Sequence, residues 1–155
     1  MKHSLIAKAE MLIRKPVAEV FEAFVNPAIR SKFWFSKGSA RLEAGKEVTW
    51  DWEMYHFSVS VKVKAVKQNV RILVEWPAYG APTLIEWIFK PRADGTTFVS
   101  VTNQGFPGNE SEAVQHALDS TEGFAFVLAG AKAFLEHKVR LNLVPDRLPD
   151  GIREH

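Results

Sequence analysis

The chain has 155 residues, 46% of them hydrophobic, which is enough for one domain with a substantial core and too few for two. Twenty Lys and Arg residues stand against eighteen Asp and Glu residues, so the net charge of +2 does not indicate a nucleic-acid-binding surface. The absence of cysteine excludes disulfides, cysteine-ligated metal centres and thiol nucleophiles. We therefore expect a single domain over residues 1–155 that binds no nucleic acid.

The first elements are predicted to be a strand and two short helices. In residues 5–14 hydrophobic and charged side chains alternate, which is typical of a half-buried strand. Pro16 ends this strand and is compatible with the first turn of a helix. Asn26-Pro27 stops that helix, because the residue before a proline disfavours helical geometry, and a second short helix is expected over about 28–33.

From 39 to 104 the hydrophobic pattern has a period of two, which predicts antiparallel strands joined by brief turns. The strand around Trp87 is ambiguous. Its pattern favours the face of Trp87 as the buried one, but Leu84 and Ile88 support the opposite face. On that second interpretation Glu86 would enter the interior as a potential general base.

A long helix is predicted to follow the strands. Asn109 and Glu112 have the spacing of a capping box, and the helix continues to about residue 138. A second side of this helix carries Phe126 and Gly130, and a small residue permits close approach of another element. We expect the irregular tail over 141–155 to cover this side, with a second subunit of a homodimer as the alternative.

The separation of strands from helices predicts an α+β fold. Specifically, we expect a helix-grip: a curved antiparallel sheet of six or seven strands around the long C-terminal helix, with two short helices after the first strand. An amphipathic helix in the concave side of the sheet leaves space between the two layers, and this space is where we expect a cavity.

The order of these elements resembles the START-like (SRPBCC) superfamily, specifically proteins similar to the activator of the heat-shock-protein-90 ATPase. The motifs that carry the resemblance are Ile13 to Pro16, Asn26-Pro27 before Trp34-Phe35, the run from Gly95 to Phe106, and Glu122 to Phe124. The resemblance implies a cavity between the sheet and the last helix that often takes an apolar small molecule. Some relatives cyclise polyketides, some bind lipids or hormones, and eukaryotic members stimulate the chaperone.

A set of mostly aromatic side chains is predicted to line that cavity. These residues are Trp34, Trp50, Trp52, Phe57, Trp76, Trp87, Asn103, Phe124 and Leu128. Rings of this size either pack as ordinary core or face a ligand, and composition alone does not separate the two interpretations. Asn103 either bonds neighbouring backbone or orients a ligand, because an inward amide without hydrogen bonds costs about 1–3 kcal/mol.

Binding of a small apolar or aromatic molecule is the function that these features favour. An enzyme of the polyketide-cyclase type and a co-regulator of the chaperone ATPase are the alternatives. The histidines are scattered and no phosphate or dinucleotide motif is present, so we predict no catalytic residue, metal site or cofactor. The N-terminal segment has no signal-peptide pattern, and no apolar run reaches the roughly 18 residues of a membrane span, so we expect a cytoplasmic protein without membrane insertion.

Overall fold

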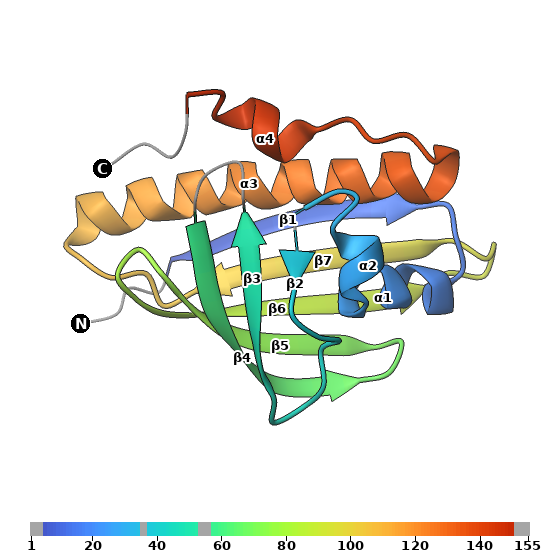
Figure 1. Cartoon of the computed structure of the whole chain (residues 1–155), viewed down its shortest axis with the longest axis horizontal. Coiled ribbons are helices and arrows are strands. Elements are labelled where there is room, and N and C mark those ends of the chain that lie inside the picture. The colour runs from blue at the N-terminus through green and yellow to red at the C-terminus, as the bar shows by residue number, and fades with distance from the viewer. Residues whose placement is uncertain (1–4, 35–36, 53–56, 151–155) are drawn as a thin grey trace.

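A computed structural model describes residues 5–34, 37–52 and 57–150 of the chain. Its core is a curved sheet whose concave side holds one long helix (Figure 1). The elements in chain order are β1 (Ile6–Ile13), α1 (Val17–Val25), α2 (Pro27–Arg30), β2 (Lys37–Gly38), β3 (Glu47–Trp52), β4 (Phe57–Lys67), β5 (Arg71–Ala78), β6 (Ala81–Pro91), β7 (Thr97–Gln104), α3 (Glu110–His137) and α4 (Leu143–Arg147).

The sheet has seven strands in the order β1-β7-β6-β5-β4-β3-β2, and neighbouring strands are antiparallel. β1 pairs with β7 over its whole length, from Ile6 opposite Gln104 to Ile13 opposite Thr97. The chain therefore starts at one edge of the sheet, crosses to the other edge through α1 and α2, and returns as a meander. The predicted α+β helix-grip, with two short helices after the first strand, is confirmed.

α3 is one continuous helix that packs along β1. Its N-terminus has the predicted capping box, in which Asn109 accepts from the backbone N–H of Glu112 and the Glu112 carboxylate accepts from that of Asn109. Near its C-terminus, Lys132 Nζ donates to the backbone oxygen of Leu12 at 2.8 Å. The capping box thus defines where α3 begins, and the Lys132 contact holds its C-terminal part against β1. Within the described residues, no helix is both long and apolar enough to cross a bilayer.

The helix boundaries differ from expectation at two places. α2 begins at Pro27, because the Asn26 side chain accepts a hydrogen bond from the Ala28 N–H at 3.0 Å and caps the helix there. It ends at Arg30 and continues as a turn to Trp34. The tail, predicted to be irregular, contains the short helix α4, which lies above α3 in Figure 1.

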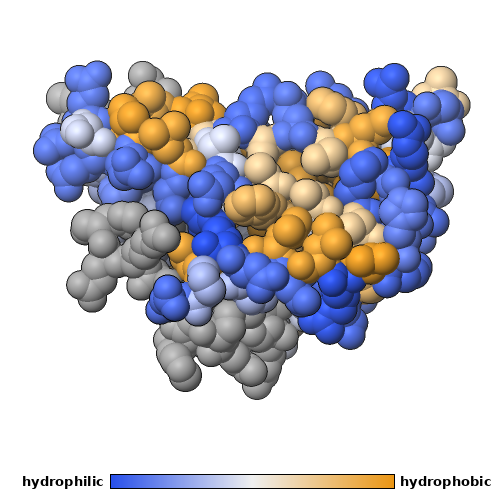
Figure 2. All heavy atoms as spheres, turned by 90° about the horizontal axis from the view of Figure 1, so that it is seen from above, coloured by the Kyte–Doolittle hydropathy of each residue, from blue (hydrophilic) through white to orange (hydrophobic). Residues whose placement is uncertain are grey.

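The tail and the turn after α2 together cover the second side of α3. Arg147 of α4 donates to the carboxylates of Asp119 and Glu122 at 2.5 and 2.7 Å. A Cβ at Gly130 would lie 3.2 Å from the backbone oxygen of Phe33, which is a tight contact, so glycine favours this close approach of the turn. Hydrophobic side chains still gather in two areas of this face (Figure 2). A homodimer therefore stays a prediction.

Replacing Gly130 tests the close approach of the turn to α3. Gly130→Leu is expected to lower the free energy of unfolding by about 1–3 kcal/mol, because the larger side chain overpacks the contact with Phe33. Chemical denaturation followed by circular dichroism measures the change. Ala125→Leu, at an exposed site of the same helix, is the control and should change stability by less than about 0.5 kcal/mol. Equal stability of the two variants would contradict the packing described.

Candidate functional site

Six aromatic residues meet between the sheet and α3, and we call them the aromatic cluster. Alternation along β3 turns Trp50 and Trp52 to the concave face, and the same alternation brings in Trp76 from β5 and Trp87 from β6. The members of the cluster are Trp34, Trp50, Trp52, Trp76, Trp87 and Phe124. The cluster thus joins three strands, α3 and the turn after α2.

The ring of Trp34 occupies the centre of this cluster. Its centroid lies 4.8 Å from that of Trp50, and its distances to the other four rings run from 5.7 to 6.4 Å. Tilted and edge-to-face pairs at these separations are the favourable arrangement for aromatic side chains. Trp34 therefore fills the region of the concave face where the sequence predicted a cavity.

The other predicted lining residues lie around the cluster. Leu128 of α3 is fully buried in the core. Phe57 begins β4 at the rim of the sheet, where its ring lies 5.6 Å from that of Trp52 and its side chain is 41% exposed. The position of Phe57 at the start of its strand explains this exposure, although the strand pattern turns it to the concave face.

Two indole N–H groups of the cluster are buried and have no hydrogen-bond acceptor among the described residues. They belong to Trp76 and Trp87. A buried donor without an acceptor costs about 1–3 kcal/mol. The cluster is therefore well packed in its ring contacts but leaves two polar donors unsatisfied.

Asn103, in contrast, is fully engaged inside the protein. Its Nδ2 donates to the Thr83 hydroxyl at 3.0 Å and to the Leu84 backbone oxygen at 2.9 Å, and its Oδ1 accepts from the Ser120 hydroxyl at 2.9 Å. This amide connects β7, β6 and α3. The contacts match the interpretation in which the side chain bonds its neighbours, while a role as ligand anchor stays a prediction.

The ambiguity over Glu86 is resolved by the burial pattern of β6. Ile85 and Trp87 are buried, so Glu86 lies on the opposite face of the sheet. Its carboxylate accepts from Nε of Arg71 at 2.5 Å. Glu86 is therefore no general base in the interior, and the alternative that turned it inward is wrong.

A buried arginine next to the cluster was not anticipated from the sequence. Arg30 ends α2, is fully buried, and places its guanidinium 4.6 Å from the ring centroid of Trp50 and 5.9 Å from that of Trp34. Its Nη1 donates to the backbone oxygen of Phe24 at 2.5 Å. Burial lowers the pKa of Arg30 to about 9, so the group is still charged at neutral pH. The short motif around Arg30 carries no signal that distinguishes it from a surface arginine.

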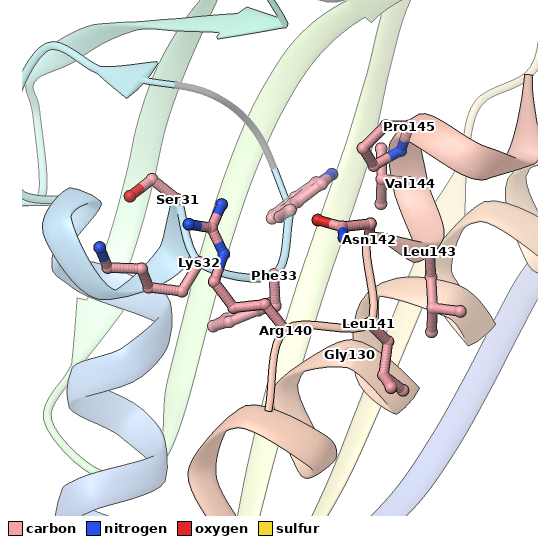
Figure 3. Close-up of a pocket in the computed structure, with 11 residues that line it drawn as sticks. Ser31, Lys32, Phe33, Gly130, Arg140, Leu141, Asn142, Leu143, Val144 and Pro145 are labelled. Atoms are coloured by element: carbon pink, nitrogen blue, oxygen red, sulfur yellow. The ribbon is translucent and has the colours of Figure 1, made fainter. Parts of the chain in front are cut away.

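A hollow of about 320 Å³ opens beside the cluster, and we call it the outer hollow (Figure 3). One wall is the turn after α2, and the other is the tail that follows α3. The lining residues are Ser31, Lys32, Phe33, Trp34, Gly130, Arg140, Leu141, Asn142, Leu143, Val144 and Pro145. Sequence analysis missed this site because its walls come from segments about a hundred residues apart.

The outer hollow combines apolar with positively charged residues. Phe33 and Trp34 border it with mostly buried rings, whereas Lys32 and Arg140 supply positive charge. Its lining includes no histidine, aspartate or glutamate among the described residues, so it offers no carboxylate or imidazole for acid–base work. Over the same residues, no group of three potential metal ligands comes together.

Comparison with known proteins agrees with this architecture. The family model described as "Activator of Hsp90 ATPase homolog 1-like protein" matches residues 14–134. No curated protein was found to be similar in sequence. The crystal structure of SSP2350 from Staphylococcus saprophyticus is 31% identical, with a TM-score of 0.75, over 88% of this chain and 96% of that chain.

Two further solved structures share the fold at lower identity. DynU16, a protein of the dynemicin biosynthetic locus, is 20% identical with a TM-score of 0.75, over 87% of this chain and 48% of its own. The Aha1 dimer from Colwellia psychrerythraea is 15% identical with a TM-score of 0.72, over 86% and 97%. Together with the family match, these structures confirm the predicted START-like fold, which is a ligand-binding fold.

The network around Asn103 makes a testable contribution to stability. Ser120→Ala removes the donor to Asn103 Oδ1 and is expected to lower the free energy of unfolding by about 1–3 kcal/mol, because a buried acceptor is left unsatisfied. Thermal or chemical denaturation measures the loss. Ser111→Ala, at an exposed site of the same helix, should change stability by less than about 0.5 kcal/mol. If both variants behave alike, the network does not contribute as described.

Proposed function

The chain belongs to the activator of Hsp90 ATPase homolog 1-like family, and we propose that it binds a small apolar or aromatic molecule at the outer hollow and the aromatic cluster behind it. The observation that carries the proposal is the position of Trp34. This residue lines the outer hollow and at the same time contacts each of the other rings of the cluster. A ligand that enters the hollow therefore meets the cluster directly.

The size and surface of the hollow support binding of one small molecule. Its volume of about 320 Å³ lies at the lower end of the range of roughly 300–1,000 Å³ found for ligand pockets. Phe33 and Trp34 border the hollow with rings that are more than nine-tenths buried, and Leu141 and Val144 add aliphatic surface from the tail. Because the exposed lining is more polar than apolar, a flat aromatic or short aliphatic body would gain most of its apolar burial from the cluster behind the hollow.

The aromatic cluster extends this site toward the sheet. Trp34 is supplied by a turn, whereas the other rings stand on strands and on α3. In our proposal a ligand ring displaces Trp34 and takes over its edge contacts. A carbonyl or ether oxygen on that ligand can then accept from the N–H groups of Trp76 and Trp87, which reduces the cost of leaving these donors buried. The predicted lining residues keep their proposed role on this basis.

The two alternative functions have less support from the site. A cyclase of the polyketide type requires a group that moves protons, and Glu86, the residue considered for that role, is paired with Arg71 on the other face of the sheet. Co-regulation of a chaperone ATPase is suggested by the family description alone. An assay of the chaperone's ATPase rate with and without this protein tests it separately.

Binding can be tested with the neutral apolar dye N-phenyl-1-naphthylamine. We expect saturable binding to the wild type, and Leu141→Gln should weaken it about three- to tenfold, because apolar surface is lost from the wall of the hollow. Dye fluorescence and quenching of tryptophan emission measure the affinity.

Leu118→Gln is the matched control for this test. Leu118 is also an exposed leucine, at 61% against 46% for Leu141, but it lies on α3 away from the hollow. The affinity of the Leu118→Gln variant for the dye should stay within about twofold of that of the wild type. Absence of saturable binding, or equal losses in the two variants, would contradict the proposed site.

A further inference from the structure

We propose that the natural ligand carries a carboxylate, held by Lys32 and Arg140, and is therefore a small amphipathic organic acid. This inference rests on the proposed function and adds the chemical class of the ligand to it. The two cations come from opposite walls of the outer hollow, Lys32 from the turn after α2 and Arg140 from the tail (Figure 3). Phe33 and Trp34 are the apolar residues of the wall that carries Lys32.

The charged side chains that line the outer hollow are all positive among the described residues. Several cations elsewhere have a carboxylate partner, such as Arg41 with Glu22 at 2.6 Å and Arg71 with Glu86 at 2.5 Å. Lys32 and Arg140, like the exposed Lys62 and Lys67 elsewhere, form no ion pair within the part of the chain that the structure describes, and no described carboxylate lines the hollow beside them. Two like charges on one small hollow raise its positive potential, and an anion bound between them would remove the repulsion.

Arg30 adds a third positive charge near the outer hollow. Its guanidinium lies 5.9 Å from the ring centroid of Trp34, a residue that lines the hollow, and it is charged at neutral pH. The buried positive charge of Arg30 favours a negatively charged ligand group in the outer hollow over a positively charged one. The three positive groups therefore select against basic ligands as well as for acidic ones.

The geometry favours a carboxylate on an apolar body. The planar guanidinium of Arg140 can donate two parallel hydrogen bonds to a carboxylate, and the ammonium of Lys32 can act as a point charge beside it. Asn142 also points its side-chain amide toward the hollow in Figure 3 and adds a polar group to the wall that carries Arg140. The ring or chain of the acid then extends past Phe33 into the aromatic cluster, where it takes the place of Trp34, so the polar and apolar ends of the ligand lie in separate parts of the site.

The test compares 2-naphthoate with 2-naphthamide, which has the same shape but no charge. Titration of the full chain at low salt, followed by tryptophan fluorescence and calorimetry, should give about tenfold tighter binding of naphthoate, since charge-assisted hydrogen bonds are added to the same apolar contact. Added salt should reduce this preference, because the cations are exposed and therefore screened.

Variants of Lys32 and Arg140 test whether these two side chains cause the preference for naphthoate over naphthamide. Lys32→Met and Arg140→Met should each weaken naphthoate about three- to tenfold and leave naphthamide within about twofold, because only the charged partner is lost. Lys62→Met, which removes an exposed lysine from the other face of β4, is the control and should change neither affinity.

Each outcome of this comparison has a definite meaning. Equal binding of both compounds, unchanged in the Met variants, overturns the carboxylate inference and leaves the proposed binding function intact. Binding of neither compound overturns both. If the protein binds phosphatidylglycerol vesicles through Lys32 and Arg140 but does not bind naphthoate, a lipid surface replaces the free acid and the inference is again wrong.

Discussion

The packing of one tryptophan ring from a turn against five rings from the sheet and α3 determines how the interior of this protein is filled. Trp34 reaches the centre of the aromatic cluster only because the turn after α2 lies tightly on α3, and that approach depends on the missing side chain at Gly130. The sheet alone would present a concave wall of indoles. With Trp34 in place, the open volume moves outward, to the surface between the turn and the tail.

Local patterns in the sequence were sufficient to predict the strands of the sheet and the helix α3, because these elements depend on residues that are close together along the chain. Alternation turned Trp50, Trp52 and Trp87 to the correct face, and the spacing of Asn109 and Glu112 located the start of α3. The same patterns did not reveal the outer hollow or the burial of Arg30, since both depend on contacts between segments distant in sequence. A period of two also could not tell whether the concave face is open or filled.

The polar groups of the interior fall into two kinds. Asn103 satisfies its amide through Thr83, Leu84 and Ser120, and thereby fixes the position of α3 on the sheet. The indoles of Trp76 and Trp87 keep unsatisfied donors only a short distance away along the same helix-facing surface. The Asn103 amide that holds α3 is thus fully bonded, whereas the two unsatisfied indole donors belong to rings in contact with Trp34, where the proposed ligand would supply acceptors.

The division of the hollow between two chain segments has a consequence for how this fold can diversify. Neither the turn after α2 nor the stretch from Arg140 to Pro145 belongs to a strand, and neither contributes a ladder hydrogen bond to the sheet. Substitutions at the exposed positions of these two segments, which leave Phe33 and Trp34 in place, can therefore reshape specificity while folding of the β-meander proceeds as before. Chimaeras that exchange only this pair of segments between relatives would transfer ligand preference onto an unchanged scaffold.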